Sequence, residues 1–208
     1  MKKTLLTIAV AALTVSSFAQ GTLNVLNSVP GVFRAPIYGP EPTESHIQLS
    51  GQSSLGIPSG TTPYGGSPLQ GSNFTFAVYY GPLGYNPYDL ILLTTTTFRT
   101  ASGNALPAGL IYPQPNVVVP GIPAGGTAML QVRVWYNEGG LINSWATAST
   151  KGASAMFSSQ PLGGGIVFAP DMTGWTSFNI SGAPIPEPRM FVFAGLGAAA
   201  LLIFRQRK

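Results

Sequence analysis

The stretch "TAMLQVRVWY", residues 127–136, decides the fold class because its side chains alternate between two faces of an extended chain. One face holds Ala128, Leu130, Val132, Val134 and Tyr136, and the other holds Thr127, Gln131, Arg133 and Trp135. The stretch "NFTFAVYY", residues 73–80, repeats this period: Phe74, Phe76, Val78 and Tyr80 oppose Thr75, Ala77 and Tyr79. Both stretches therefore predict β-strands with one buried face.

Further short runs, rich in β-branched and aromatic residues, are bounded by Gly, Pro, Asn or Ser. They cover residues 22–28, 89–98, 115–121, 164–169 and 175–180. Away from the two ends no long run has a helical period. The pattern predicts an all-β chain, with a single antiparallel β-sandwich over residues 20–183 that is either jelly-roll-like or immunoglobulin-like. Residues 37–71 are rich in Gly, Pro, Ser and Thr, which predicts long exposed loops with at most a short strand near 46–49.

The positive charge belongs to the ends of the chain. The sequence has a formal net charge of +4, but the stretch from Gln20 to Ile185 holds four cations and five carboxylates. A body that is slightly acidic lacks the basic surface that nucleic acids require, so we expect no nucleic-acid partner. The chain has no cysteine, which excludes disulfides, thiolate zinc sites and a cysteine nucleophile.

Residues 1–19 have the organisation of a secretory signal helix. Lys2 and Lys3 precede an apolar run, and Ser17 and Ala19 flank Phe18 in the small-residue pattern that signal peptidase reads. We expect cleavage between Ala19 and Gln20, and therefore export.

The C-terminal segment, residues 184–208, combines a rigid triplet, a hydrophobic helix and a basic tip. Pro186, Glu187 and Pro188 stand before Met190–Phe204, which holds no charged residue. A helix of this length rises only ~22 Å, so we expect a marginal membrane anchor. Basic residues flank the helix, and those at its C-terminal end predict a cytoplasmic tip: Arg189, Arg205, Arg207 and Lys208.

The order of these parts resembles the PEP-CTERM sorting signal. The resemblance implies that exosortase, a membrane-embedded protease, recognises Pro186, Glu187 and Pro188, cuts near them, and passes the protein to the outer envelope, the cell surface or the extracellular matrix. In this sequence Arg189 follows the triplet, where the family more often has Ser or Thr. A looser resemblance to the bodies of exported PEP-CTERM proteins covers residues 20–39 and 119–157. It implies a β-rich fold and supplies no active site.

Chemistry-bearing residues are few between Gln20 and Ile185, where one histidine and five carboxylates occur. Glu41, Glu44 and His46 lie close together in the sequence, but they lack a fourth ligand and a dedicated metal-site spacing. His46 has no G-x-S-x-G elbow to accompany it. We therefore expect no enzyme activity, no metal and no cofactor.

Two functions fit these observations. The first is a non-catalytic protein of the envelope or extracellular matrix, with signal peptidase and exosortase as its processing partners. The second is a carbohydrate-binding module of the extracellular polysaccharide matrix, in which aromatic rings would stack on sugars. For that function the candidates are Tyr85, Tyr88 and Trp135.

Overall fold

Strands β4 (Phe74–Gly81) and β7 (Met129–Tyr136) lie side by side at the centre of the main sheet. The computed structural model describes residues 20–100 and 108–182. The two strands pair antiparallel without a register shift, from Phe74 opposite Tyr136 to Gly81 opposite Met129. The two segments with the clearest period-two pattern thus form the centre of the fold, as predicted.

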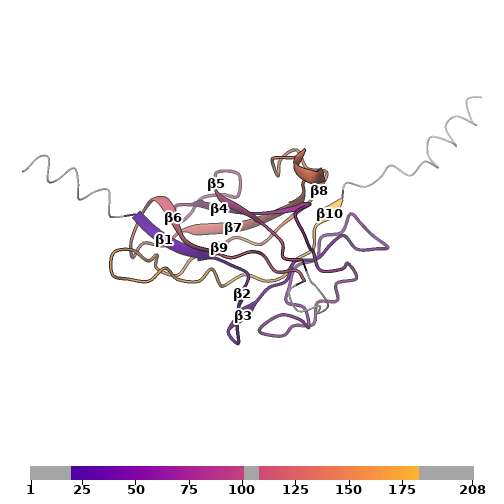
Figure 1. The fold of residues 1–208 in the computed structure, drawn as a ribbon, viewed down its shortest axis with the longest axis horizontal. Helices are drawn as coiled ribbons and strands as arrows, with labels where there is room; N and C mark the ends of the chain where they lie inside the picture. The colour runs from indigo at the N-terminus through magenta and orange to yellow at the C-terminus, as the bar shows by residue number, and fades with distance from the viewer. Residues whose placement is uncertain (1–19, 101–107, 183–208) are drawn as a thin grey trace, which may run out of the picture.

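The remaining elements are mostly short strands (Figure 1). They are β1 (Gln20–Val25), β2 (Ser28–Val29), β3 (Phe33–Arg34), β5 (Ile91–Thr97), β6 (Gln114–Pro123), β8 (Thr150–Ala153), β9 (Phe157–Ser158) and β10 (Ser181–Gly182). A 3-10 helix, η2 (Glu138–Gly140), follows β7.

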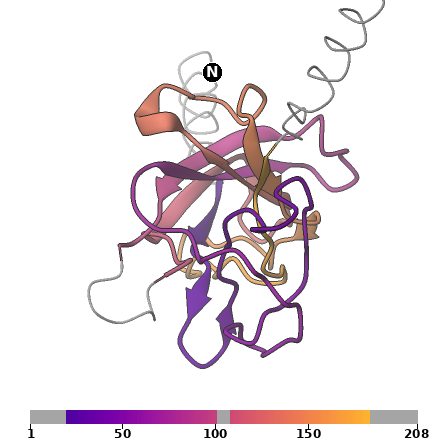
Figure 2. The ribbon, with the colours of Figure 1, turned by 90° about the vertical axis from the view of Figure 1, so that its right-hand side faces the viewer.

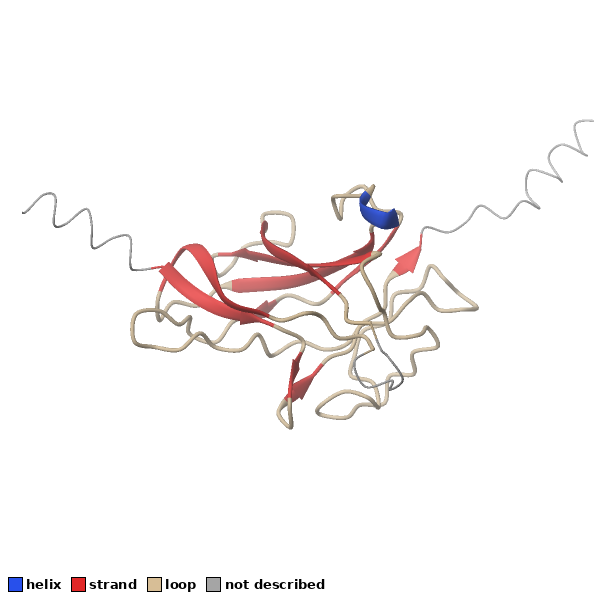
Figure 3. Ribbon diagram, viewed as in Figure 1, coloured by secondary structure: helices blue, strands red, loops and turns tan. Residues whose placement is uncertain are grey.

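All the strand pairs are antiparallel (Figure 3). The main sheet has the order β10-β8-β7-β4-β5, and β9 also pairs with β7. β1 pairs with β6, and β2 pairs with β3 as a small hairpin. The all-β, antiparallel prediction is therefore confirmed for the described residues.

One hydrophobic core joins the strands of different sheets. Leu23 of β1 and Val119 of β6 belong to the same buried cluster as Phe76 of β4 and Val132 of β7. Trp175 lies within this cluster and contacts four phenylalanine rings, those of Phe33, Phe76, Phe157 and Phe178. The main sheet therefore packs its apolar face against the β1–β6 pair and the chain around Trp175.

The opposite face of the main sheet, called the outer face below, is partly covered by the loop 137–149. A small second cluster forms there around Ala77, Trp135 and Ala148. The loop and the β2–β3 hairpin lie on opposite sides of the main sheet in both ribbon views (Figures 1 and 2).

Residues 37–71 are irregular, as predicted, with isolated bridges in place of strands. The short strand near residues 46–49 does not form; a single bridge joins Ser50 to Phe178. The segment is not uniformly exposed, because Ile37, Tyr38 and Leu69 are buried. Its apolar residues complete the core, while much of its Gly- and Ser-rich remainder stays at the surface.

Two strand predictions are wrong. Residues 164–169 form a tight turn closed by backbone hydrogen bonds between Gly164 and Val167, and residues 175–180 are extended but make only isolated bridges. Four short strands, β3, β8, β9 and β10, were not predicted. β8 and β9 gain their pairing from β7, β10 pairs with β8, and β3 pairs with β2.

The predicted signal helix (residues 1–19) and the predicted sorting segment (residues 184–208) lie outside the described residues. Within the described ranges, no helix is both long and apolar enough to cross a membrane. Gln20 opens β1 and Gly182 closes β10, so strands occupy both ends of the described body.

Candidate functional site

The outer face of the main sheet carries aromatic and cationic side chains that alternate in space. The guanidinium carbon of Arg133 lies 4.0 Å from the centre of the Tyr79 ring and 5.0 Å from that of Trp145. The ammonium nitrogen of Lys151 lies 4.6 Å from the Trp145 ring centre. These separations are within the range of cation–π attraction. We call Tyr79, Arg133, Trp145 and Lys151 the cation–aromatic row.

Strand pairing explains why Tyr79, Arg133 and Lys151 lie on the same face of the main sheet. Ala77 of β4 pairs with Arg133, and Lys151 of β8 pairs with Trp135. Because side chains alternate along a strand, Tyr79 shares the face of Ala77, and Lys151 shares the face of Trp135 and Arg133. All three therefore point away from the main core, opposite to Val132 and Val134.

The fourth member, Trp145, is delivered by the loop 137–149. The buried Asn137 fixes the start of this loop: its side chain donates to Ser72 O at 2.8 Å and Thr75 Oγ1 at 3.0 Å. Its side-chain oxygen accepts a hydrogen bond from Gly140 N. At the other end, the indole nitrogen of Trp145 donates to Gly152 O at 3.2 Å. The loop thus holds the indole over β8.

The partners of the two cations are neutral. Arg133 donates from Nε to Gln131 Oε1 at 2.9 Å and from a terminal nitrogen to the carbonyl of Pro87. Lys151 donates to the carbonyls of Trp145 and Ala146, at 3.0 and 2.9 Å. No ion pair between described residues involves Arg133 or Lys151. Both cations are thus held in place by neutral acceptors, with no described carboxylate paired to them.

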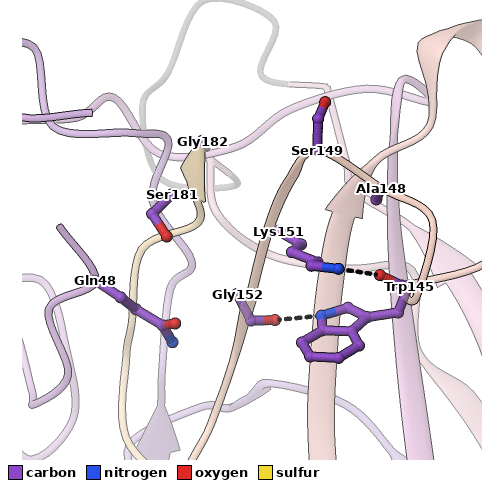
Figure 4. A pocket seen from close by; sticks show the side chains of 8 residues that line it. All are labelled: Gln48, Trp145, Ala148, Ser149, Lys151, Gly152, Ser181 and Gly182. Atoms are coloured by element: carbon purple, nitrogen blue, oxygen red, sulfur yellow. Dashed lines mark hydrogen bonds between the residues drawn. The ribbon is translucent and has the colours of Figure 1, made fainter. Parts of the chain in front are cut away.

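A cleft of about 420 Å³ lies next to the row, over β8 and β10. Figure 4 shows Gln48 and Ser181 on one side of β8, and Trp145 and Lys151 on the other. Gln48 donates to Ala153 O at 2.7 Å, which leaves its side-chain oxygen as an acceptor. The cleft therefore combines an indole, an ammonium group, hydroxyls and an amide, which are groups suited to a polyhydroxylated ligand.

Two of the three aromatic residues predicted from the sequence are exposed near the row. Tyr88 is 97% exposed and Tyr85 43% exposed, and both lie in the loop between β4 and β5. The hydrogen bond from Arg133 to Pro87 joins this loop to the row.

The structure corrects the expectation for Trp135. Its side chain is on the predicted face, but it is only 2% exposed because the loop 137–149 covers it. Its indole nitrogen donates to Ile142 O at 3.0 Å. Trp135 thus has no ring face available to a ligand.

A second cleft, of about 280 Å³, lies within the irregular segment 37–71. The rings of Tyr38 and Tyr64 stack beside it with centroids 4.2 Å apart. Burial, and then the nearby Tyr38 and Glu41, raise the pKa of Tyr64 well above its ordinary value. The Tyr64 phenol therefore stays protonated at neutral pH and is not a base there.

The carboxylates and the histidine of this segment do not form a metal site. Across residues 20–100 and 108–182, no group of three His, Cys, Asp or Glu side chains lies close enough to hold an ion. Glu41 instead accepts hydrogen bonds from Gly65 N, at 2.9 and 3.2 Å to its two oxygens.

The residues predicted to direct processing lie outside the described ranges, except for Gln20. These are Ala19, Pro186, Glu187, Pro188, Arg189, Arg205, Arg207 and Lys208. Along the sequence, the last described residue before the triplet is Gly182, which lines the cleft beside the row.

Comparison of the chain with protein family models, with curated proteins and with solved structures found no match in any of the three.

Sequence reasoning missed most of the row. The shared period placed Tyr79 and Arg133 on one face of their strands, which was a usable signal. Trp145 and Lys151 carried no such signal, because their position depends on how the loop 137–149 folds back over β8.

Proposed function

We propose that this protein is an exported, non-catalytic component of the bacterial envelope or extracellular matrix, sorted by exosortase through its C-terminal segment. The observation that carries the proposal is the order of parts in residues 184–208: Pro186-Glu187-Pro188, then an apolar segment, then a basic tip. The signal-like residues 1–19 support the same topology, with the body outside the cytoplasm.

The composition of the body supports a non-catalytic role. Acid–base and nucleophilic chemistry needs titratable groups brought together in one site. His46 is the chain's one histidine, and the carboxylate of Glu41 is engaged by the backbone of Gly65. Tyr64, whose pKa is raised by burial, does not supply the missing base.

Mass spectrometry of the protein recovered from its native host tests the sorting proposal. We expect the mature C-terminus to lie near Pro186–Pro188, and Glu187→Ala to leave the uncut chain in the membrane fraction. Glu44→Ala is a matched control that removes one carboxylate from the body. If Lys208 is intact on all mature molecules, sorting is contradicted and a simple membrane anchor remains.

The second candidate function is carbohydrate binding. It is favoured by the cation–aromatic row and by Tyr88, an exposed ring in the loop whose Pro87 carbonyl accepts a hydrogen bond from Arg133. Exposed rings offer flat apolar surfaces to the C–H faces of sugars, and the hydroxyls of the adjacent cleft can exchange hydrogen bonds with them.

Affinity electrophoresis of the full chain through gels that contain polysaccharide tests this candidate. We expect retarded migration in at least one gel, with the retardation reduced by Trp145→Ala and by Tyr88→Ala. Tyr112→Ala is a matched control, because Tyr112 is 54% exposed and lies by β5, away from the row. Unretarded migration in every polysaccharide gel would leave only the structural role.

The fold that we propose is a β-sandwich in which the main sheet forms one layer and the β1–β6 pair forms a smaller second layer. The proposal is supported by the core that these strands share. Jelly-roll-like and immunoglobulin-like connections both remain open for it.

A further inference from the structure

No carboxylate among the described residues forms an ion pair with either cation of the row. Arg133 and Lys151 are two of the four cations between Gln20 and Ile185, and they approach the same indole ring. Their hydrogen-bond partners are one side-chain amide and three backbone carbonyls. A backbone carbonyl orients a cation but does not cancel its charge, so the row presents a fixed, uncompensated charge at a partly exposed surface.

Both cations keep hydrogen-bonding capacity. A guanidinium has five N–H groups and an ammonium has three. Arg133 uses Nε and one terminal nitrogen, and Lys151 donates to two carbonyls. The remaining N–H groups are therefore available to an acceptor that arrives from the solvent.

Asp89, the carboxylate of the adjoining loop between β4 and β5, is engaged locally. Asp89 accepts hydrogen bonds at 3.4 Å from the backbone and side-chain nitrogens of Asn86. It forms no ion pair with Arg133, although Pro87 of the same loop is bonded to that residue. The loop thus approaches Arg133 through a carbonyl.

We propose that the cation–aromatic row and the adjoining cleft form a binding site for an acidic polysaccharide, in which a sugar carboxylate pairs with Lys151 or Arg133 while the sugar ring lies against Trp145. This inference rests on the proposed carbohydrate binding and adds its ligand class. Charge-assisted hydrogen bonds from preoriented cations are stronger than neutral ones, so they favour a uronate over a neutral hexose. Gln48, Ser149 and Ser181 supply neutral hydrogen-bonding groups for the hydroxyls of the same polysaccharide.

A nucleic acid is a weaker fit to the same row. Its affinity grows with the number of phosphates that the protein neutralises. The row offers two cations, and the stretch from Gln20 to Ile185 has more carboxylates than cations. A polyuronate needs fewer ionic contacts, because hydroxyl contacts and stacking on Trp145 add to its affinity.

The test compares two forms of one polymer. The full chain, in a mild non-ionic detergent, is titrated calorimetrically with polygalacturonate oligosaccharides and with the same oligosaccharides after methyl esterification, which removes the charge and keeps the sugar backbone. We expect binding of the acid form that weakens severalfold when salt is raised from about 0.05 M to about 0.5 M. We expect affinity for the ester to be lower by about tenfold or more.

Variants locate the site. Lys151→Gln should lower affinity for the acid form by about tenfold, and Lys151→Arg should restore much of it. Arg99→Gln is a control matched in charge, because Arg99 donates to Ile111 O beyond β5. The circular dichroism spectrum of each variant reports whether it folds, and the comparison of acid with ester needs no variant.

The outcomes separate the two proposals. Binding of neither form overturns the acidic ligand class, whereas the proposed carbohydrate binding falls only if no polysaccharide gel retards the chain. Equal binding of both forms keeps carbohydrate binding and overturns the acidic ligand class. Equal losses in Lys151→Gln and Arg99→Gln overturn the row as the site. Tighter binding of a single-stranded oligonucleotide than of polygalacturonate overturns the sugar as the ligand.

Discussion

The indole nitrogen of Trp135 donates a hydrogen bond to the carbonyl of Ile142 at 3.0 Å. This bond attaches the loop 137–149 to the outer face of the main sheet, and the same loop carries Trp145. The two tryptophans therefore have different tasks: Trp135 supports the loop from beneath, and Trp145 presents its ring at the rim of the cleft.

Replacing Trp135 should cost more stability than replacing Trp145. Trp135→Ala removes a ring that is 2% exposed, and we expect it to lower the free energy of unfolding by about 3 kcal/mol. Trp145→Ala removes a half-buried ring and should cost about 1 kcal/mol. Urea unfolding followed by circular dichroism measures both. Equal costs for the two variants would contradict this division of tasks.

Asn27 is expected to be among the most sensitive polar residues of the body. It is 1% exposed, donates to Ala35 O and Gly109 O at 3.1 and 2.8 Å, and accepts from Ile111 N at 3.1 Å. Asn27→Ala removes three hydrogen bonds and leaves Ala35 O and Ile111 N without the Asn27 side chain, whereas Gly109 O keeps Ile37 N as a donor. We therefore expect a loss of about 3 kcal/mol in the free energy of unfolding.

Asn86→Ala is the matched control for Asn27→Ala, because the side chain of Asn86 is exposed and makes one long bond, to Asp89. It should change the free energy of unfolding by less than about 0.5 kcal/mol. Similar losses in the two variants would contradict the idea that burial of the Asn27 hydrogen bonds determines the cost of Asn27→Ala.

The stability of the fold should depend on pH through Tyr64. Its phenol lies 2.7 Å from Gly51 O and 2.8 Å from Ser177 O, and burial raises its pKa well above the ordinary 10.0. Above pH 10 the unfolded chain releases this proton while the folded chain keeps it. The stabilisation is therefore complete below pH 10 and is lost progressively as the pH rises further.

Tyr64→Phe checks this dependence. At neutral pH the variant should lose about 1 kcal/mol, because it removes the single phenol proton that lies between the Gly51 and Ser177 carbonyls, while Ser177 O keeps the Gly51 N–H as a donor. Above pH 10 its free energy of unfolding should decline less steeply than that of the parent chain, as measured by urea unfolding across the alkaline range. Tyr112→Phe, at an exposed position, should leave the alkaline slope unchanged. A parallel decline in Tyr64→Phe and the parent would contradict the assignment.

The sequence predicts a strand where the segment itself alternates apolar and polar residues, and it misses strands that lack this alternation. β4 and β7 alternate strictly, and their buried faces, such as Phe76 and Val132, follow that alternation. β8 has Lys151 and Gly152 at its centre, carries no alternating pattern of its own, and pairs with β7 on one side and β10 on the other. Gly152 also allows a close approach, since a Cβ there would lie 2.6 Å from Asn179 O.

The candidate site was less predictable because long-range contacts assemble it. Tyr88 was expected in an exposed loop and lies in one, with its side chain 97% exposed. Only the path of the loop 137–149 decides that the Trp135 ring is covered while the Trp145 ring reaches the cleft. No local pattern encodes that path, so the sequence did not reveal that Trp135 is covered.

Residues 164–168 were also misread from their local sequence pattern, because they form a turn and not the predicted strand. Ile166 is 99% exposed and Phe168 93%, whereas Phe178 is fully buried. Phe168→Ala should change the free energy of unfolding by less than about 0.5 kcal/mol, because backbone bonds between Gly164 and Val167 close the turn. Phe178→Ala should cost about 4 kcal/mol.

Adjacent exposed apolar side chains also promote self-association. The double substitution Ile166→Ala with Phe168→Ala should therefore raise the concentration at which the protein begins to associate, as measured by analytical ultracentrifugation. Leu83→Ala is the control, since it removes a single exposed apolar side chain elsewhere on the surface. A large loss of stability in Phe168→Ala would mean instead that the turn packs its phenylalanine against the body in solution, and the exposed apolar tip would no longer explain any association.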